Sequence, residues 1–437
     1  METKKKGFPT AFWVCACTEI FERLAYYLGR SLILIFVTAS VATGGLGLSD
    51  TVAANMQSNL TAFSYLLPLF GAVIVDKYIG ARYTTPVGMF IAAAGYFTGG
   101  IAKSSAGVYA MIFLVSLGLA LFKNGAIIGR VITDKSQMDP AFSMRYTLVN
   151  VGAFIGTFLV GILYKDVFAK DGVLGFAPCF KMAALMMVLG GLWYIFVCWR
   201  FLGDLGKLPF KKTLTEEEKA AEAKKKEETG TKQPLTTIEK KRIGAIFVAS
   251  LFSIVFWIFW YLGYMPVYFY WAENMDWVVA GYQVPSTWFD AANSLFCVIL
   301  GPVTAALWKK LAARPQGDMS LFRKTGLGIA IIGVGYLFYA AIDIMRGGEK
   351  ASVLWLIVFA FLLTMGEMFF SPLGHSFISK YSPSRYLAVM MSVWGFATFI
   401  AAKSYGPVYG LLFGGKIEFK VACIGVAVVS FAAALRR

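Results

Sequence analysis

Charged residues are scarce in this sequence of 437 residues. Only 15% of the positions are Asp, Glu, Lys or Arg, against roughly 25% in an ordinary soluble domain, while 58% are apolar. A soluble protein of this length could not cover so much apolar surface with polar side chains. The same composition excludes an intrinsically disordered chain. The sequence therefore predicts a protein whose main solvent is lipid.

Histidine and cysteine are also rare, with one His and six Cys. Six Cys in so long a chain exclude a secreted disulfide scaffold, and their positions lack the spacing of a metal site. An intramembrane enzyme would need a nucleophile with a base, or a metal cluster. One His, no metal spacing and no G-x-S-x-G elbow argue against it. We therefore expect a protein that is not an enzyme and that needs no metal or other cofactor.

Long apolar runs are abundant, and breaks at Gly, Pro and charge clusters divide them into twelve candidate spans of about 20 residues or more. The candidates lie near residues 8–42, 50–75, 81–102, 106–130, 143–164, 176–202, 243–272, 284–308, 322–345, 352–379, 386–413 and 417–435. We therefore predict an all-α membrane protein that crosses the bilayer many times.

The net charge of +16 is unevenly distributed. Most Lys and Arg outside the spans lie in loops on the side of the N-terminus, so the positive-inside rule places both termini in the cytoplasm. This distribution explains the charge by topology and by attraction to anionic membrane lipids, and nucleic acid is not an expected partner. We expect a multi-pass protein of a bacterial-type cytoplasmic membrane.

One hydrophilic segment, residues 203–242, interrupts the apolar pattern. It is rich in Lys, Glu and Ala, and it is typical of a charged linker rather than of a domain. It separates a six-helix bundle at residues 1–202 from a second at 243–437. Two six-helix bundles of similar length are typical of a major facilitator transporter.

A few charges lie inside the expected spans, where they are costly and usually functional. They are Glu19, Glu22, Arg23, Arg30, Lys123, Asp290, Glu367 and Lys403. Lys403 is expected either to pair with an acid or to extend toward the membrane surface.

The first span has a polar stripe. Glu19, Glu22, Arg23, Tyr26, Tyr27 and Arg30 follow one another at helical spacing, at about 100° per residue, so they share one face. A carboxylate beside a guanidinium in a cavity can link proton binding to substrate binding, because a substrate that competes for the Arg releases the acid. A purely structural ladder of ion pairs is the alternative.

These residues resemble the proton-dependent oligopeptide transporter family (POT family) of the major facilitator superfamily. Its E-x-x-E-R motif with a following Tyr pair stands here as EIFERLAYY, residues 19–27. Further matches are GAVIVDKYIGAR (71–82), MRYTLVNVGAF (144–154, with Asn150 and Gly152), FDAANSLF with Asn293, GEMFFSPLG (366–374) and MMSVWGF (390–396). The resemblance covers nearly the whole chain.

The resemblance implies a proton-coupled symporter that imports di- and tripeptides by alternating access and binds the peptide termini in a central cavity. It implies proton coupling by Glu19, Glu22, Arg23 and Lys123, with the two basic residues pairing with the acids. Arg30 and Lys123 would bind the peptide carboxylate, and Glu367, with Asn150 and Asn293, the ammonium group. Further substrate contacts are implied for Tyr26, Tyr27, Tyr65, Trp257, Ser371 and Trp394, and gating for Asp76 and Arg82. Protons would be the coupling ion, and the protein is expected to act as a monomer.

Two departures from the family pattern leave the cargo open. Lys123 is followed by Asn124 rather than by the usual Pro, and Tyr261 stands where the family has an acid four residues after Trp257. Asp290 is a candidate replacement for that acid. The alternative is the same type of transporter with another small anion or zwitterion, such as nitrate, a modified amino acid or a peptide-like metabolite. A sensor with the same fold but without transport also stays open.

Overall fold

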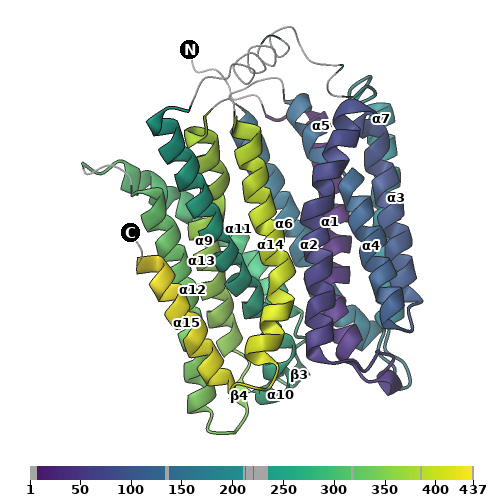
Figure 1. Ribbon diagram of the computed structural model, residues 1–437. Coiled ribbons are helices and arrows are strands. Elements are labelled where there is room, and N and C mark those ends of the chain that lie inside the picture. Colours follow the sequence, from purple (N-terminus) through teal and green to yellow (C-terminus); the bar gives the residue numbers. More distant parts are fainter. Residues whose placement is uncertain are drawn as a thin grey trace. The chain divides into compact units, whose positions relative to one another are not determined.

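The chain folds almost entirely into α-helices, as the computed structural model in Figure 1 shows. The structure describes residues 7–132, 137–209, 212, 220, 235–315, 319–383 and 386–435. The chain forms two compact units. The first contains residues 1–47 and 66–214, and the second contains residues 48–65 and 215–437. Much of the expected linker, namely residues 210–211, 213–219 and 221–234, lies outside the described residues.

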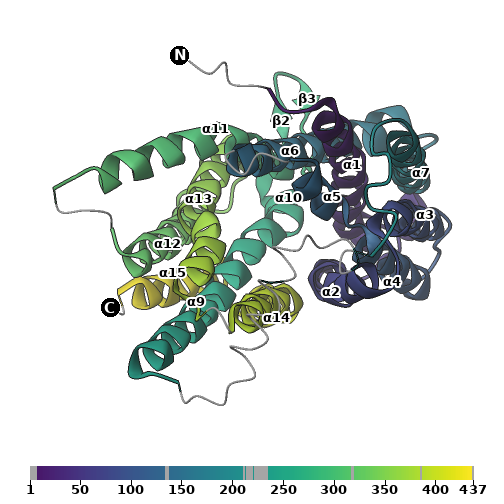
Figure 2. The same cartoon turned by 90° about the horizontal axis from the view of Figure 1, so that it is seen from above.

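The first unit is helical. Its elements are α1 (Thr10–Thr38), η1 (Val41–Thr43), the later part of α2 (Asp50–Lys77), α3 (Ala81–Gly100), α4 (Ser105–Leu121), α5 (Asn124–Val131), α6 (Met138–Ile162), the π-helix η3 (Leu163–Val167) and α7 (Phe176–Arg200). Helix α1 packs against α6 and α7, and α3 packs between α4 and α7 (Figure 2).

The second unit takes the first part of α2, up to residue 65, together with the C-terminal helices. Those helices are α9 (Thr237–Tyr268), α10 (Tyr270–Asn274), α11 (Trp288–Ala312), α12 (Leu321–Met345), α13 (Trp355–Tyr381), α14 (Leu387–Phe413) and α15 (Phe419–Leu435). Helices α12 and α15 lie side by side in both Figure 1 and Figure 2, and α9 packs against α14.

Short strands connect helices in the second unit. β1 (Met275–Asp276) pairs in parallel with β4 (Ala351–Ser352). β2 (Val278–Val279) pairs antiparallel with β3 (Tyr282–Gln283). The two residues between β2 and β3, Ala280 and Gly281, both have positive φ, at 51° and 80°. Positive φ at both loop residues is typical of two-residue hairpins with a type I′ turn, whose twist matches that of the strands.

The expected span at 106–130 is wrong as a single helix, because it is broken between α4 and α5. Lys123 has φ −125° and ψ 31°, outside the helical region. Its backbone N–H donates to the hydroxyl of Thr85 on α3, at 3.2 Å, which satisfies a donor that the break would leave unpaired. No Pro is needed for this break, because the side chain of a neighbouring helix supplies the partner.

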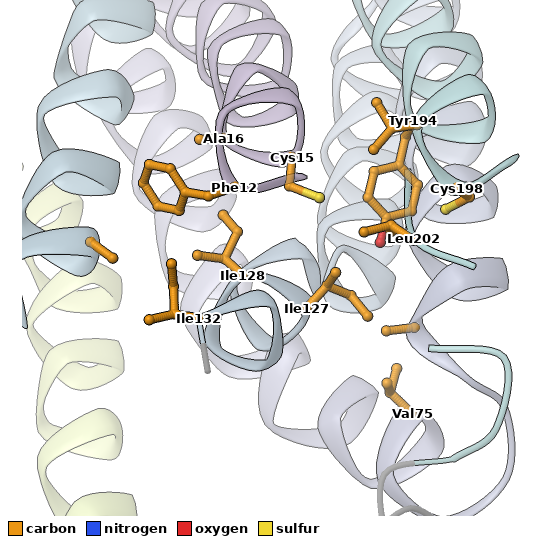
Figure 3. Packing of buried hydrophobic residues seen from close by; sticks show 13 residues of the cluster. Phe12, Cys15, Ala16, Val75, Ile127, Ile128, Ile132, Tyr194, Cys198 and Leu202 are labelled. Carbon is orange, nitrogen blue, oxygen red and sulfur yellow. The ribbon is translucent and has the colours of Figure 1, made fainter. Parts of the chain in front are cut away.

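A buried apolar cluster holds together one end of the first unit. Figure 3 shows Phe12 and Ala16 of α1, Ile127 and Ile128 of α5, and Tyr194 of α7 among its members. The cluster fixes α5 against α1, and α5 begins with Asn124, which contacts Glu19. The local geometry of the charged residues on α1 therefore rests on packed apolar side chains.

The described residues contain six helices that are long and apolar enough to cross a membrane. They span Asp50–Val75, Pro140–Val167, Phe176–Arg200, Thr237–Asn274, Trp288–Leu311 and Phe322–Met345. Large apolar side chains are also exposed along α7, including Leu192 and Trp199. So much exposed apolar surface needs a lipid solvent. The protein is a multi-pass integral membrane protein, as the composition predicts.

Candidate functional site

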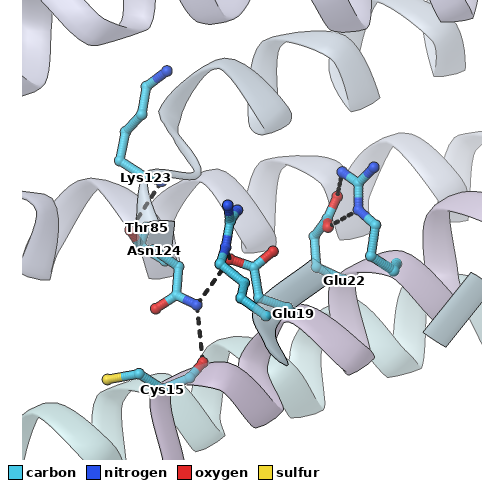
Figure 4. A network of polar contacts seen from close by, with 8 residues as sticks. Cys15, Glu19, Glu22, Thr85, Lys123 and Asn124 are labelled. Carbon is cyan, nitrogen blue, oxygen red and sulfur yellow. Dashed lines mark hydrogen bonds and ion pairs between the residues drawn. The ribbon is translucent and has the colours of Figure 1, made fainter. Parts of the chain in front are cut away.

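The centre of the polar stripe on α1 is an ion pair between neighbours in sequence. Glu22 is completely buried, and its carboxylate accepts hydrogen bonds from Nε and, at 2.5 Å, Nη2 of Arg23 (Figure 4). The Arg23 side chain keeps 26% of its surface exposed. Two parallel hydrogen bonds from one guanidinium make this a strong, directional pair. Its carboxylate is therefore shielded from solvent while its cation stays accessible.

Glu19, one turn earlier on α1, has its partners on two other helices. Its Oε1 accepts from Nε of Arg145 on α6, at 2.9 Å, and from Nδ2 of Asn124 on α5, at 3.1 Å. The same Asn124 nitrogen donates to the backbone oxygen of Cys15 at 2.9 Å. Glu19 therefore joins α1, α5 and α6 within the first unit, and Figure 4 shows this network.

Arg145 was not among the residues expected from the sequence to carry function. The expected span at 143–164 places Arg145 at its start, next to the loop whose cations set the orientation. Helix α6 begins at Met138, which places Arg145 about two turns inside it. The sequence signal that could have identified Arg145 is its position as a basic residue inside the MRYTLVNVGAF motif.

Lys123 has a different hydrogen-bond partner from the two carboxylates that were expected. Its Nζ donates to the backbone oxygen of Pro68 at 2.8 Å, and Figure 4 shows its side chain pointing away from Glu19. The hydrogen-bond partners of Glu19 come from Asn124 and Arg145 instead. The break before α5 turns Asn124, rather than Lys123, toward α1.

Three expected substrate residues lie on the second half of the stripe. Arg30 is buried, and its guanidinium lies 6.0 Å from the ring of Tyr27. The Tyr27 ring lies edge-on to Tyr26, and Arg23 lies 5.0 Å from the Tyr26 ring. Asn150 on α6 donates within its own helix. Aromatic faces therefore accompany both arginines, an arrangement that favours cations.

The expected gating residue Arg82 binds the loop after α7. Its Nη1 donates to the backbone oxygen of Gly203. In the same loop Lys207 donates to Asp204 at 2.5 Å, and this hydrogen bond lowers the pKa of the Asp204 carboxyl. The other expected gating side chain, that of Asp76, lies outside the described residues.

In the second unit, the acid Glu367 lies buried on α13. Nδ2 of Asn293 on α11 donates to its Oε2 at 3.3 Å and to Thr364 at 2.8 Å, and the Cys297 thiol lies 3.8 Å from Oε2. Ser371 follows one turn later on the same helix and is half-buried. The structure thus brings Glu367 and Asn293 together without a basic residue among these contacts.

Tyr261, which stands where the family pattern has an acid, belongs to an aromatic cluster. Tyr261 is buried, its ring stacks on Tyr405 at 4.8 Å, and its hydroxyl donates to that of Tyr65 at 3.5 Å. Trp257 lies 6.0 Å from Tyr261, and Trp394 is buried on α14. Tyr65, which belongs to the second unit, is 45% exposed. Aromatic rings therefore lie next to this position.

Two further charged residues of the second unit each form a hydrogen bond with a neutral side chain. The buried Asp290 accepts a hydrogen bond from the hydroxyl of Tyr268. Lys403 donates to the amide oxygen of Asn59 rather than to an acid. The hydrogen bond to Asp290 therefore comes from a neutral tyrosine hydroxyl. The part of the chain that the structure describes contains no group of three or more His, Cys, Asp or Glu that could hold a metal ion.

Comparison with solved structures identifies the fold. A POT family transporter, crystallised in complex with 5-aminolevulinic acid, superimposes with a TM-score of 0.85 over 99% of this chain and 96% of its own, at 23% sequence identity. At this identity the likeness establishes the fold. The chain is a membrane protein with the fold of the POT family transporters.

Sequence comparison leads to the same family. The POT family model matches residues 205–413. The uncharacterized transporter YclF of Bacillus subtilis is 25% identical over 91% of this chain and 87% of its own length. A di-/tripeptide transporter of Lactococcus lactis subsp. cremoris is 24% identical over 89% of this chain and 86% of its own length. The resemblance to the POT family, predicted from the motifs, is confirmed.

Proposed function

We propose that this protein is a proton-coupled symporter that imports di- and tripeptides by alternating access. The observation that carries the coupling is the buried Glu22 carboxylate, held by an Arg23 that stays partly exposed. A substrate carboxylate that attracts Arg23 leaves Glu22 buried and uncompensated, and such an acid takes up a proton. The peptide class is supported by the di-/tripeptide transporter that aligns over most of the chain.

A zwitterionic peptide needs a cation for its carboxylate and an anion for its ammonium group. The first unit offers Arg30, which is buried beside the Tyr27 ring. The second unit offers Glu367, oriented by Asn293. Arginine binds carboxylates with two hydrogen bonds, and aromatic rings accept varied side chains without demanding one. Lys123 is a second basic candidate for the carboxylate.

We infer the topology from the same fold. Twelve helices would cross the bilayer, with α4 and α5 forming one broken span and α9 and α10 forming another, and both termini would lie in the cytoplasm. The cytoplasmic membrane of a bacterium is the proposed location, since the aligned relatives are bacterial. The protein would work as a monomer among membrane lipids, catalyse no chemical reaction and use protons as its only coupling partner.

Uptake into liposomes tests the proposal. With the purified protein in liposomes, an inward proton gradient should drive accumulation of a labelled dipeptide, and a protonophore should abolish it. For one proton per peptide, one pH unit sustains about tenfold accumulation, since one unit corresponds to 1.36 kcal/mol. Uptake that ignores the gradient would contradict coupling, and a lack of any peptide uptake would contradict the transport function.

Glu367→Gln should weaken peptide binding selectively through the ammonium group. The neutral amide keeps the shape but loses a charge-assisted hydrogen bond, worth about 1.5–3 kcal/mol, so the Kd for a dipeptide should rise at least about tenfold. Competition with a labelled peptide measures this. An N-acetylated dipeptide, which lacks the ammonium group, is the control. Equal losses for both ligands would show that Glu367 does not bind the ammonium group.

The same transporter with another small zwitterion or anion is the second candidate. It is favoured by Tyr261 at the family's acid position, where aromatic rings surround it. It is also favoured by the structurally similar POT family transporter in complex with 5-aminolevulinic acid. A thermal-shift screen of dipeptides, 5-aminolevulinic acid and nitrate separates the candidates. Stabilisation by a non-peptide, without stabilisation by any peptide, would favour this second candidate.

A further inference from the structure

The pairing of charges on α1 differs from what helical spacing favours. Glu19 and Arg23 are four residues apart, with the acid first, which is the favourable arrangement on a helix. Adjacent residues such as Glu22 and Arg23 do not normally face each other. Yet Arg23 binds Glu22 with two hydrogen bonds. Something must therefore keep Arg23 away from Glu19.

Arg145 occupies the Glu19 carboxylate in place of Arg23. Its Nε lies 2.9 Å from Oε1, an ion pair in which Glu19 is only 2% exposed. Asn124 donates to the same oxygen and is itself fixed on the backbone of Cys15. Arg145 compensates the charge of the buried Glu19 carboxylate, and both donors satisfy its oxygen, so a second guanidinium would add little stability.

The place of the Arg145 side chain is created by a glycine. A Cβ atom added to Gly125 on α5 would lie 3.0 Å from both Cζ and Nη2 of Arg145. This separation is tighter than ordinary van der Waals contact, so any side chain at position 125 would press on the guanidinium. Gly125 and Asn124 together thus shape the site where Arg145 meets Glu19.

We propose that Arg145 is a positioning residue that sets the partner of Arg23. By binding Glu19 it keeps Arg23 on Glu22, the pair to which the proposed function assigns proton coupling. Without Arg145, Arg23 turns to Glu19, and Glu22 loses its cation. Among the described residues, the titratable or charged groups that interact with Glu22 are Glu19 and Arg23 on α1, Tyr96 on α3 and Arg145 on α6.

A double-mutant cycle tests this exchange without any transport assay. Apparent melting temperatures are measured for Glu19→Gln, Arg23→Gln and their combination, in the natural chain and in an Arg145→Gln background. We expect additive effects in the natural chain and a non-additive shift of about 2 °C or more in the background lacking Arg145. Additivity in both backgrounds would overturn the proposal, whatever the substrate of the protein is.

A second variant tests the proposal in case the Arg145→Gln protein does not fold. Gly125→Val keeps both charges but displaces the guanidinium, so the Glu19–Arg23 cycle should become non-additive there as well. Arg145→Lys, which keeps a cation, should stay closer to the natural chain. Arg200→Gln, on the exposed end of α7, is the matched control and should leave the cycle additive. An additive cycle in a folded Gly125→Val protein would also overturn the proposal.

The pH profile of uptake provides a readout that a purely structural role would not move. In Arg145→Gln, the pH midpoint of gradient-driven dipeptide uptake should rise by about one unit or more, because an acid that loses a neighbouring cation binds protons more readily. Arg200→Gln should keep the natural midpoint. An unchanged midpoint in a folded, transporting Arg145→Gln protein would overturn the proposal. If the natural chain transports no peptide, the proposed function fails while the melting cycle still decides the pairing.

Discussion

Replacing Glu22 by glutamine should reduce the accumulation of a labelled dipeptide in liposomes to the level reached without a proton gradient. Glutamine has nearly the same shape and can still accept a hydrogen bond from Arg23, but it cannot take up a proton. For one proton per peptide, one pH unit supplies 1.36 kcal/mol, so accumulation should fall from about tenfold to about onefold. Time courses with and without the gradient measure this change.

A matched control separates loss of coupling from loss of folding. Glu418→Gln removes an acid whose side chain is 70% exposed and pairs with Lys420, so its uptake should equal that of the natural chain. Exchange of labelled for unlabelled dipeptide, which needs no net proton movement, should fall much less than gradient-driven uptake in Glu22→Gln. Gradient-driven accumulation that survives in this variant would show that the proton is carried elsewhere.

Replacing Gly156 by leucine should strongly destabilise the first unit. A Cβ atom at this position would collide with the backbone oxygen of Leu24 on α1. One turn earlier, a Cβ at Gly152 would lie 2.9 Å from the backbone oxygen of Ile20. Small residues four apart allow helices in membranes to approach closely, and their loss forces the backbones apart. Overpacking costs about 1–3 kcal/mol, and leucine should reach the upper end.

The apparent melting temperature in detergent measures this destabilisation. Gly425→Leu on α15 is the matched control, because a Cβ there meets nothing within 4 Å and the residue is exposed. Leucine at this control position should be neutral or slightly stabilising, since leucine favours helices more than glycine does. Equal melting temperatures for the two variants would contradict the close packing of α1 on α6.

The helical content and the family were predictable from the sequence, because both depend on local patterns. Apolar runs of about 20 residues predict spanning helices whatever their neighbours are. The EIFERLAYY segment contains its acids and cations within nine consecutive residues, so their common face follows from helical geometry alone. Gly152 was predicted as part of a motif, although its contact with Ile20 was not.

The partners of the charged residues were not predictable in the same way. Arg145 lies at the start of the expected span but about two turns inside α6, because the apolar pattern starts several residues after the helix does. The break at Lys123 turned a different residue, Asn124, toward Glu19. The neutral partner of Lys403, Asn59, lies 344 positions away along the chain. Each of these outcomes depends on a second helix, which no local pattern specifies.

The sequence by itself determined that lipid is the solvent, that the chain is helical and that Glu19, Glu22 and Arg23 share one face of a helix. These features follow from composition and from the 3.6-residue period. Only the tertiary structure decided that Arg23 holds Glu22 while Arg145 holds Glu19. The physical reason is that a buried charge takes whichever partner the packing brings within hydrogen-bond distance, and contacts between helices set that packing.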